Sequence, residues 1–191
     1  MLHVETVAPR TLEILKTLMA HPMLADFHLA GGTALALQLG HRISTDLDLF
    51  TYQPFLSEVV IGELKTGFGF RQQIDRGYFV RGFIENVKVD LLKYPYPPID
   101  AEVRVEGIRM LSPKDIAPMK LSAVTNRGRK RDFVDVYVLL QHFDLQTMVG
   151  WYVQKCGGDP FMLRQSLTYF GDAEGDTDLK VLNEIRWPEV K

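Results

Sequence analysis

The sequence predicts an α/β (α+β) fold, in which a small mixed β-sheet is backed by helices and carries a helical lobe at its C-terminal end. Short segments that alternate polar and apolar residues occur in the N-terminal part, between segments of helical periodicity. From Ser112 onward, the periodic segments are helical. We therefore expect an α/β core over residues 1–111 and a helical lobe over residues 112–191, packed on the core or merged with it into one compact domain.

Composition and charge exclude some classes of protein. Of the 191 residues, 46% are hydrophobic and 24% charged, as in ordinary globular proteins. The net charge of -2 argues against a dedicated duplex-DNA binder, although it leaves room for a local basic patch. The single cysteine, Cys156, allows no internal disulfide, so we expect a reducing, cytoplasmic location. No apolar segment reaches the roughly 20 residues needed to cross a bilayer, and we expect no membrane partner.

The start of the chain predicts a helix, a strand, a second helix and a second strand. Residues 9–20 form an amphipathic pattern that begins at a proline. Residues 27–30 are short and apolar, as in a strand, and lead into Gly31-Gly32. Residues 33–39 are rich in Ala and Leu, which favours a helix. Residues 46–50 alternate with period two, which predicts a half-buried strand.

The next part of the core predicts one helix followed by three strands. Residues 54–67 place apolar side chains on one helical face. Residues 68–84 have the aromatic, glycine-punctuated character of two strands joined near Arg76-Gly77. Residues 87–91 alternate again, and the three prolines within residues 94–98 predict a loop.

The C-terminal part predicts a series of helices. Ser112, followed by a proline and by Asp115 three residues later, is a typical helix start. Further helical patterns cover residues 130–142, 145–155 and 160–170.

The glycine pair is the first candidate for chemistry. Two glycines after a strand let the backbone approach a ligand closely, and the N-terminus of the following helix attracts phosphate. The hydroxyl of Thr33 would add a donor. Taken alone, Gly31-Gly32 is explained more simply by a tight turn that needs a positive φ.

Three aspartates on predicted strands are the second candidate. Asp46 and Asp48 are two residues apart, so both face the same side of a strand and repel each other unless a cation neutralises them. Such oxygen pairs suit Mg²⁺. Asp90 lies on a later strand with Lys88 on the same face. The alternative is a solvated acidic face, and a joint site requires the two strands to be neighbours.

A basic segment is the third candidate. No acid interrupts its cations, which are Lys120, Arg127, Arg129, Lys130 and Arg131. Such a segment above an acidic metal site would bind phosphates. Asp132 and Asp135 follow at helical spacing and share a face. The alternative is a surface pair of salt-bridged helices.

Together these motifs resemble the signature of the nucleotidyltransferase superfamily typified by DNA polymerase β. In that signature a glycine pair is followed by a spacer, an acid–apolar–acid strand and a later strand acid. Here the spacer has thirteen residues. Within the superfamily the chain is more similar to the AbiEii/AbiGii toxin family, over about residues 29–140. The segments that carry this likeness are Gly31–Leu37, His41–Ser44, Asp46–Phe50, Lys120–Ala123, Arg127 and Arg131–Tyr137.

The resemblance implies a nucleotidyltransferase core that moves a nucleoside monophosphate from a nucleoside triphosphate, such as ATP or GTP, to an acceptor. Two Mg²⁺ ions, or Mn²⁺ in their place, would be held by Asp46, Asp48 and Asp90. Asp90 would also help to deprotonate the acceptor hydroxyl. The nucleotide would be bound by Gly31, Gly32, Thr33, Arg42, Lys120 and Arg131. Asp135 would have a catalytic role, orienting Lys120 or a metal-bound water.

The resemblance also implies a biological role, as the toxin of a toxin–antitoxin or phage-defence system with a cognate antitoxin. The acceptor is left open between an RNA or tRNA end, a protein and a small molecule. Two alternatives remain at this stage. One is a non-catalytic nucleotide-binding or interaction protein of the same fold, and the other is a Mg²⁺-dependent phosphohydrolase or sugar transferase.

Overall fold

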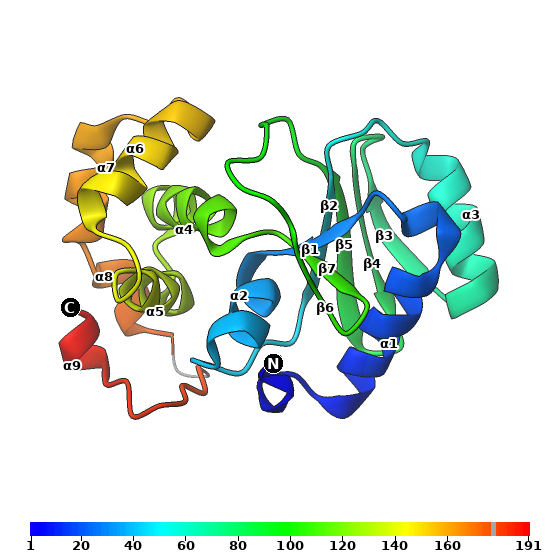
Figure 1. The fold of residues 1–191 in the computed structure, drawn as a ribbon, viewed down its shortest axis with the longest axis horizontal. Helices are drawn as coiled ribbons and strands as arrows, with labels where there is room; N and C mark the ends of the chain where they lie inside the picture. The colour runs from blue at the N-terminus through cyan, green and yellow to red at the C-terminus, as the bar shows by residue number, and fades with distance from the viewer. Residues whose placement is uncertain (177–178) are drawn as a thin grey trace.

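The computed structural model describes residues 1–176 and 179–191, and its secondary structure follows the predicted order (Figure 1). The helices are α1 (Pro9–Ala20), α2 (Gly31–Leu39), α3 (Ser57–Phe68), α4 (Pro113–Arg127), α5 (Lys130–Leu139), α6 (Leu145–Cys156), α7 (Pro160–Leu167), α8 (Gly171–Glu174) and α9 (Trp187–Val190). The strands are β1 (His28–Ala30), β2 (Leu47–Thr51), β3 (Arg71–Asp75), β4 (Phe79–Ile84), β5 (Val87–Lys93), β6 (Val103–Val105) and β7 (Ile108–Met110). Short 3₁₀ helices cover Val4–Thr6 and Pro22–Leu24.

The strands form one mixed sheet in the order β3-β4-β5-β2-β1-β7-β6. The inner pairs β2·β5 and β1·β7 are parallel, and the remaining neighbours are antiparallel. The predicted mixed sheet with helices is therefore confirmed. The parallel pairing of β2 with β5 meets the condition on which a joint aspartate site depends.

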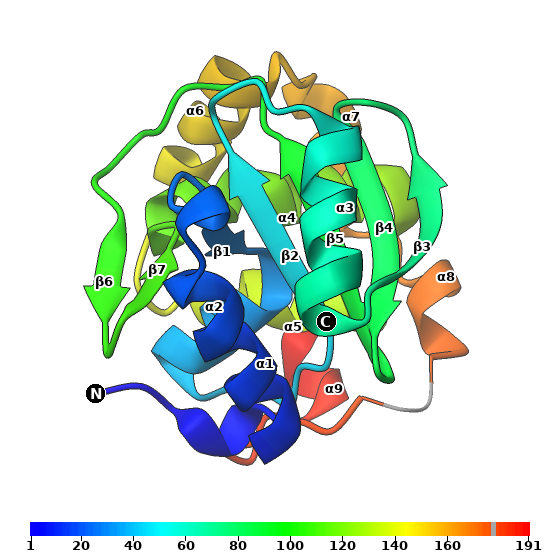
Figure 2. The ribbon, with the colours of Figure 1, turned by 90° about the vertical axis from the view of Figure 1, so that its right-hand side faces the viewer.

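Helices cover both faces of the sheet. Helices α1 and α3 lie on one face, whereas α2 and the C-terminal helices lie on the other (Figures 1 and 2). Leu47 and Leu49 of β2 face the first layer and are fully buried in the same core as Leu15 and Leu18 of α1. Because side chains alternate along a strand, Asp48 faces the opposite way, toward the lobe. The predicted start of α4 is confirmed by the Asp115 amide, which donates to the Ser112 hydroxyl at 3.1 Å.

The structure differs from the sequence-based expectation in one hairpin, in the two short helices α8 and α9, which were not predicted, and in some boundaries. Strands β6 and β7 were not predicted, because three residues are too few for a clear period. Glu106 and Gly107, both at positive φ, form the two-residue turn between them. Helices α5 and α7 end three residues earlier than expected, at Leu139 and Leu167, and α3 begins at Ser57.

The C-terminal segment returns to the core. Arg42 and Val181 pair as in an antiparallel sheet. The Ile43 amide donates to the Lys180 carbonyl at 2.9 Å, and the Leu182 amide donates to the His41 carbonyl at 2.8 Å. This segment therefore contributes to the region between core and lobe. The boundary between core and lobe after residue 111 stays a prediction. None of the helices in the described part of the chain has the length and apolar character to cross a bilayer.

Candidate active site

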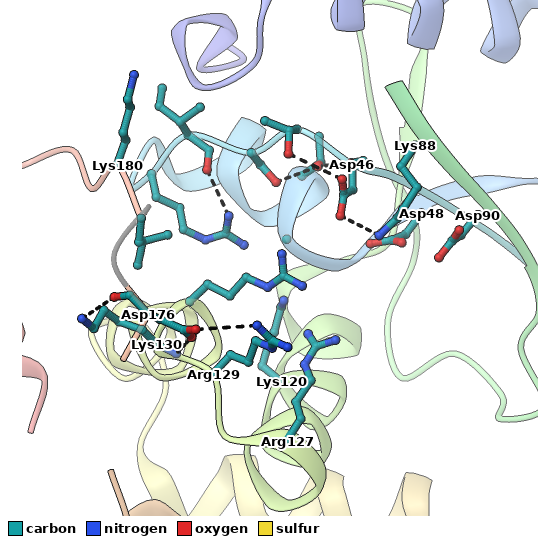
Figure 3. A pocket seen from close by; sticks show the side chains of 18 of the residues that line it. Asp46, Asp48, Lys88, Asp90, Lys120, Arg127, Arg129, Lys130, Asp176 and Lys180 are labelled. Atoms are coloured by element: carbon teal, nitrogen blue, oxygen red, sulfur yellow. Dashed lines mark hydrogen bonds and ion pairs between the residues drawn. The ribbon is translucent and has the colours of Figure 1, made fainter. Parts of the chain in front are cut away.

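A cavity of about 650 Å³ lies between the sheet and the lobe (Figure 3). The core contributes three acids together with the sheet cations Arg81 and Lys88, and the lobe contributes the basic segment. Its charged lining residues are Arg42, Asp46, Asp48, Arg81, Lys88, Asp90, Lys120, Arg127, Arg129, Lys130, Arg131, Asp176 and Lys180. The three predicted aspartates and the complete predicted basic segment therefore meet at one cavity.

The sheet register brings the acids together. Asp48 of β2 is paired directly with Asp90 of the parallel strand β5, and Asp46 stands just before β2 begins. All three face the lobe, because Leu47 and Leu49 occupy the opposite face. The alternative of a solvated acidic face does not fit Asp90, which is only 6% exposed.

Two of the acids have a cation from the sheet itself. The Lys88 Nζ lies 2.6 Å from the Asp46 Oδ2. Arg81 of β4 donates two hydrogen bonds to Asp90, from Nε at 2.8 Å and from Nη2 at 2.7 Å. Sequence analysis missed Arg81 as a site residue, because only the pairing of β4 with β5 places it opposite Asp90. The sequence indicates Lys88 only as a residue on the same strand face as Asp90.

Asp48 has no comparable partner among the described residues. Burial, and after it the negative charge of Asp90, raise the pKa of Asp48 above its ordinary value. A carboxylate in this setting is stabilised by an added cation. The carboxylate oxygens of Asp46 and Asp48 are suitable ligands for Mg²⁺ or Mn²⁺. Within the described residues, however, no three acids, histidines or cysteines are close enough to bind one ion in this conformation. Asp90 would have to be released by Arg81 to become a ligand.

The glycine pair begins α2 and allows two close approaches. Gly31 has a φ of +65°, and a Cβ there would lie 2.5 Å from the Asp48 Oδ2. A Cβ on Gly32 would lie 2.0 Å from the Arg42 Nη2 and 3.5 Å from the Lys120 Nζ. No side chain caps the helix N-terminus. Its amides and the two cations are thus available to the same anion.

Thr33 lines the cavity, but its hydroxyl is engaged within the protein. Its side chain is 1% exposed, and its hydroxyl lies 2.8 Å from the Ser44 hydroxyl and also donates to the Asp46 carbonyl. The hydroxyl therefore fixes the segment that precedes β2, where a direct phosphate contact had been expected. Ser44 was not predicted as a site residue, although it ends the segment His41–Ser44 that carries part of the family resemblance.

Asp135 is fully buried and connects three basic side chains. It accepts from Arg42 Nε at 2.6 Å, from Arg42 Nη2 at 2.9 Å and from Lys120 Nζ at 2.7 Å, and lies 2.7 Å from His41 Nε2. Burial alone would raise the pKa of Asp135, but the charges of Arg42 and Lys120 hold it well below the ordinary value. Asp135 does not line the cavity, and its contacts hold the Lys120 and Arg42 side chains in place.

Asp132 has the same kind of role toward Arg127. It is fully buried and accepts two hydrogen bonds of 2.8 Å from the Arg127 guanidinium, whose side chain is 47% exposed. The Lys120 Nζ is 3.7 Å away. The surface salt-bridge alternative is therefore wrong for Asp132 and Asp135, because both lie in the interior.

The remaining cations stand at the rim of the cavity. Arg129 and Lys130 both contact Asp176 (Figure 3), and Arg131 lies beside them. Lys180 reaches the rim because its segment pairs with Ile43. This arrangement can hold a polyanion against buried acids.

Comparison with known proteins places the chain in a family. The family model described as "Nucleotidyl transferase AbiEii toxin, Type IV TA system" matches residues 13–155. An uncharacterized protein of Aquifex aeolicus (strain VF5), aq_aa25, is 32% identical over 196 residues, covering 94% of this chain and 89% of that one.

Two solved structures share the fold. The TM-score is 0.52 with JHP933 from Helicobacter pylori, at 22% identity, covering 74% of this chain and 72% of that chain. The TM-score is 0.56 with ANT(2")-Ia in complex with adenylyl-2"-tobramycin, at 18% identity, covering 76% of this chain and 96% of that chain. The family match covers the glycine pair, the three aspartates and the basic segment. The chain therefore belongs to the nucleotidyl transferase AbiEii toxin family and is a nucleotidyltransferase.

Proposed function

We propose that this enzyme transfers a nucleoside monophosphate from a nucleoside triphosphate to an acceptor hydroxyl, with two Mg²⁺ or Mn²⁺ ions at Asp46, Asp48 and Asp90. The observation that carries the proposal is the pairing of Asp48 with Asp90 across from a basic wall in one cavity. The metal ions, when bound, neutralise charge on the reacting phosphorus and on the leaving group.

The residues of the chain divide the remaining work. The amides at Gly31 and Gly32 bind the terminal phosphates together with Lys120 and Arg131. Asp90 accepts the proton of the acceptor hydroxyl. The acceptor oxygen then forms a bond to the α-phosphorus while the bond to the β-phosphate oxygen breaks, and pyrophosphate leaves toward the basic wall. Arg42 lies under Gly32 and supports the phosphate site through its contact with Asp135.

The acceptor is an RNA or tRNA end, a protein or a small molecule. Arg129, Lys130 and Lys180 at the rim favour an anionic acceptor, such as RNA, because several cations stand outside the space that a triphosphate needs. Membership in the toxin family supports a role as the toxin of a toxin–antitoxin pair, with a cognate antitoxin as a protein partner.

The test is incubation with each α-labelled nucleoside triphosphate, Mg²⁺ and either total RNA or a protein lysate. Label on a macromolecule supports transfer and identifies the acceptor class. Release of labelled monophosphate alone would contradict transfer and indicate a phosphohydrolase.

Binding without turnover is the second candidate function. It is favoured by one specific observation, the double hydrogen bond from Arg81 to Asp90, which neutralises the proposed base without a metal. In that case the triphosphate would bind, and no label would move even when every acceptor fraction is supplied.

A further inference from the structure

A second cavity, of about 550 Å³, adjoins the first one across Asp48. Asp48, Lys120 and Arg127 line both cavities. The walls of the second cavity come from the C-terminal ends of β2 and β5, from the proline-rich loop after β5, and from α4 and α6. Its size is in the range of small-ligand sites, roughly 300–1,000 Å³.

The second cavity is aromatic where the first is basic. Phe50 and Tyr96 each lie 5.3 Å from Tyr94 between ring centroids, at interplanar angles of 37° and 76°, so the three rings form one contiguous aromatic cluster. Tyr152 adds a fourth ring from α6. The exposed Asn126 also lines the cavity, and its side-chain amide donates to the Ser122 carbonyl at 2.8 Å while its amide oxygen remains an acceptor. This composition suits a planar, uncharged group with polar edges.

The loop that carries Tyr96 is held in place before any ligand arrives. Asp115 accepts from the Ile99 amide at 2.8 Å and from the Asp100 amide at 3.1 Å. Asp115 is also paired with Lys155, and both side chains are buried. Prolines on both sides of Tyr96 restrict the loop further. Little conformational entropy is therefore lost when a ligand binds to the aromatic surface.

We propose that the aromatic cavity binds the nucleobase and ribose of the nucleoside triphosphate, an inference that rests on the proposed function. If the terminal phosphates of the nucleotide lie in the first cavity and its α-phosphorus lies near Asp48, the nucleoside must extend into the second cavity. The acceptor does not fit there, because Asp90, which takes its proton, lines the first cavity and not the second. The acceptor consequently approaches from the side of Arg81 and Lys88.

The test compares nucleotide with bare phosphate. Binding of ATP, GTP, CTP and UTP, and of inorganic tripolyphosphate, is measured by calorimetry in Mg²⁺ buffer for the wild type, Tyr96→Ala and Tyr78→Ala. Tyr78 is 58% exposed in the turn between β3 and β4, and serves as the matched control. We expect Tyr96→Ala to weaken binding of the preferred nucleotide roughly tenfold, as for loss of one stacking partner. Binding of tripolyphosphate should not change, and Tyr78→Ala should behave as the wild type.

A second variant and an alkylation experiment on Cys156 control for a folding defect in Tyr96→Ala. Ser122→Leu fills the same cavity from α4 and should have the same selective effect. Cys156, the only cysteine, lines the cavity, so nucleotide should protect it from alkylation while tripolyphosphate should not. The inference is overturned if both variants weaken the binding of nucleotide and of tripolyphosphate equally, or if neither variant weakens the binding of nucleotide. Transfer of label by the wild type would persist in either case. A wild type that binds neither ligand overturns the proposed function itself.

Discussion

Arg81 and Asp90 are opposite each other on antiparallel strands and are joined by two hydrogen bonds, of 2.8 and 2.7 Å. The guanidinium thus occupies both oxygens of a carboxylate that is proposed to ligate metal. A divalent metal ion would compete with Arg81 for the same charge, so we expect the arginine to lower the metal affinity of the site.

Replacing Arg81 should therefore strengthen metal binding. In Arg81→Met, the dissociation constant for Mn²⁺, measured by electron paramagnetic resonance, should fall roughly tenfold, equivalent to about 1.4 kcal/mol. Arg76→Met is the control, because Arg76 lies exposed in a turn and its side chain makes no hydrogen bond or ion pair with the described residues. Unchanged or weaker Mn²⁺ binding in Arg81→Met would show that the arginine does not compete.

Asp135 should be indispensable for stability because it neutralises two buried cations. Asp135→Asn leaves Arg42 and Lys120 without their carboxylate, and removal of one partner of a buried pair costs about 3–5 kcal/mol. The free energy of unfolding from urea titrations measures this loss. Asp26→Asn, at an exposed position, should change it little. A loss below about 1 kcal/mol in Asp135→Asn would contradict the assigned role.

The same residue predicts a dependence on pH. The pKa of Asp135 is lower in the folded state than in the unfolded state, so the unfolded chain binds the proton more readily. The stabilisation is complete above the unfolded value of about 3.9 and is lost as the pH falls from there toward the folded value. The stability difference between wild type and Asp135→Asn should shrink on acidification below about pH 4. A constant difference across this range would refute the assignment.

Replacement of glycine by alanine should have opposite effects on stability at Gly32 and at Gly62. A Cβ on Gly32 meets Arg42 at 2.0 Å, so Gly32→Ala should displace the guanidinium, destabilise the fold by about 1–3 kcal/mol and impair triphosphate binding. Gly62 in α3 has open space around it, and Gly62→Ala should stabilise the protein by up to about 1 kcal/mol. Thermal unfolding and nucleotide titration of both variants check this contrast. Normal nucleotide binding by Gly32→Ala would contradict the close approach.

The site residues that lie close together in the sequence, on one strand or in one turn, could be predicted from the sequence. Alternation placed Asp46 and Asp48 on one face, and the glycine pair marked the start of a helix. The combination of motifs then related them to Asp90 and to the basic segment. These local signals do not depend on how the strands are ordered.

Contacts between distant segments could not be predicted in this way. Arg81 becomes a partner of Asp90 only through the register of β4 and β5. Lys180 joins the cavity only because its segment pairs with residues near Ile43, more than a hundred positions away. Thr33 was expected to face phosphate, and its burial against Ser44 depends on the path of the chain before β2. Hydrophobic periodicity contains no information on any of these pairings.

Asp48 is expected to be required for chemistry and not for folding. Transfer of label from the α-labelled nucleotide should be measured for Asp48→Asn beside the wild type and Asp26→Asn. We expect transfer to fall at least about a hundredfold in Asp48→Asn. Its unfolding temperature should be equal or higher, because burial and Asp90 disfavour the charged form of Asp48. Transfer at the wild-type rate by Asp48→Asn would contradict the account.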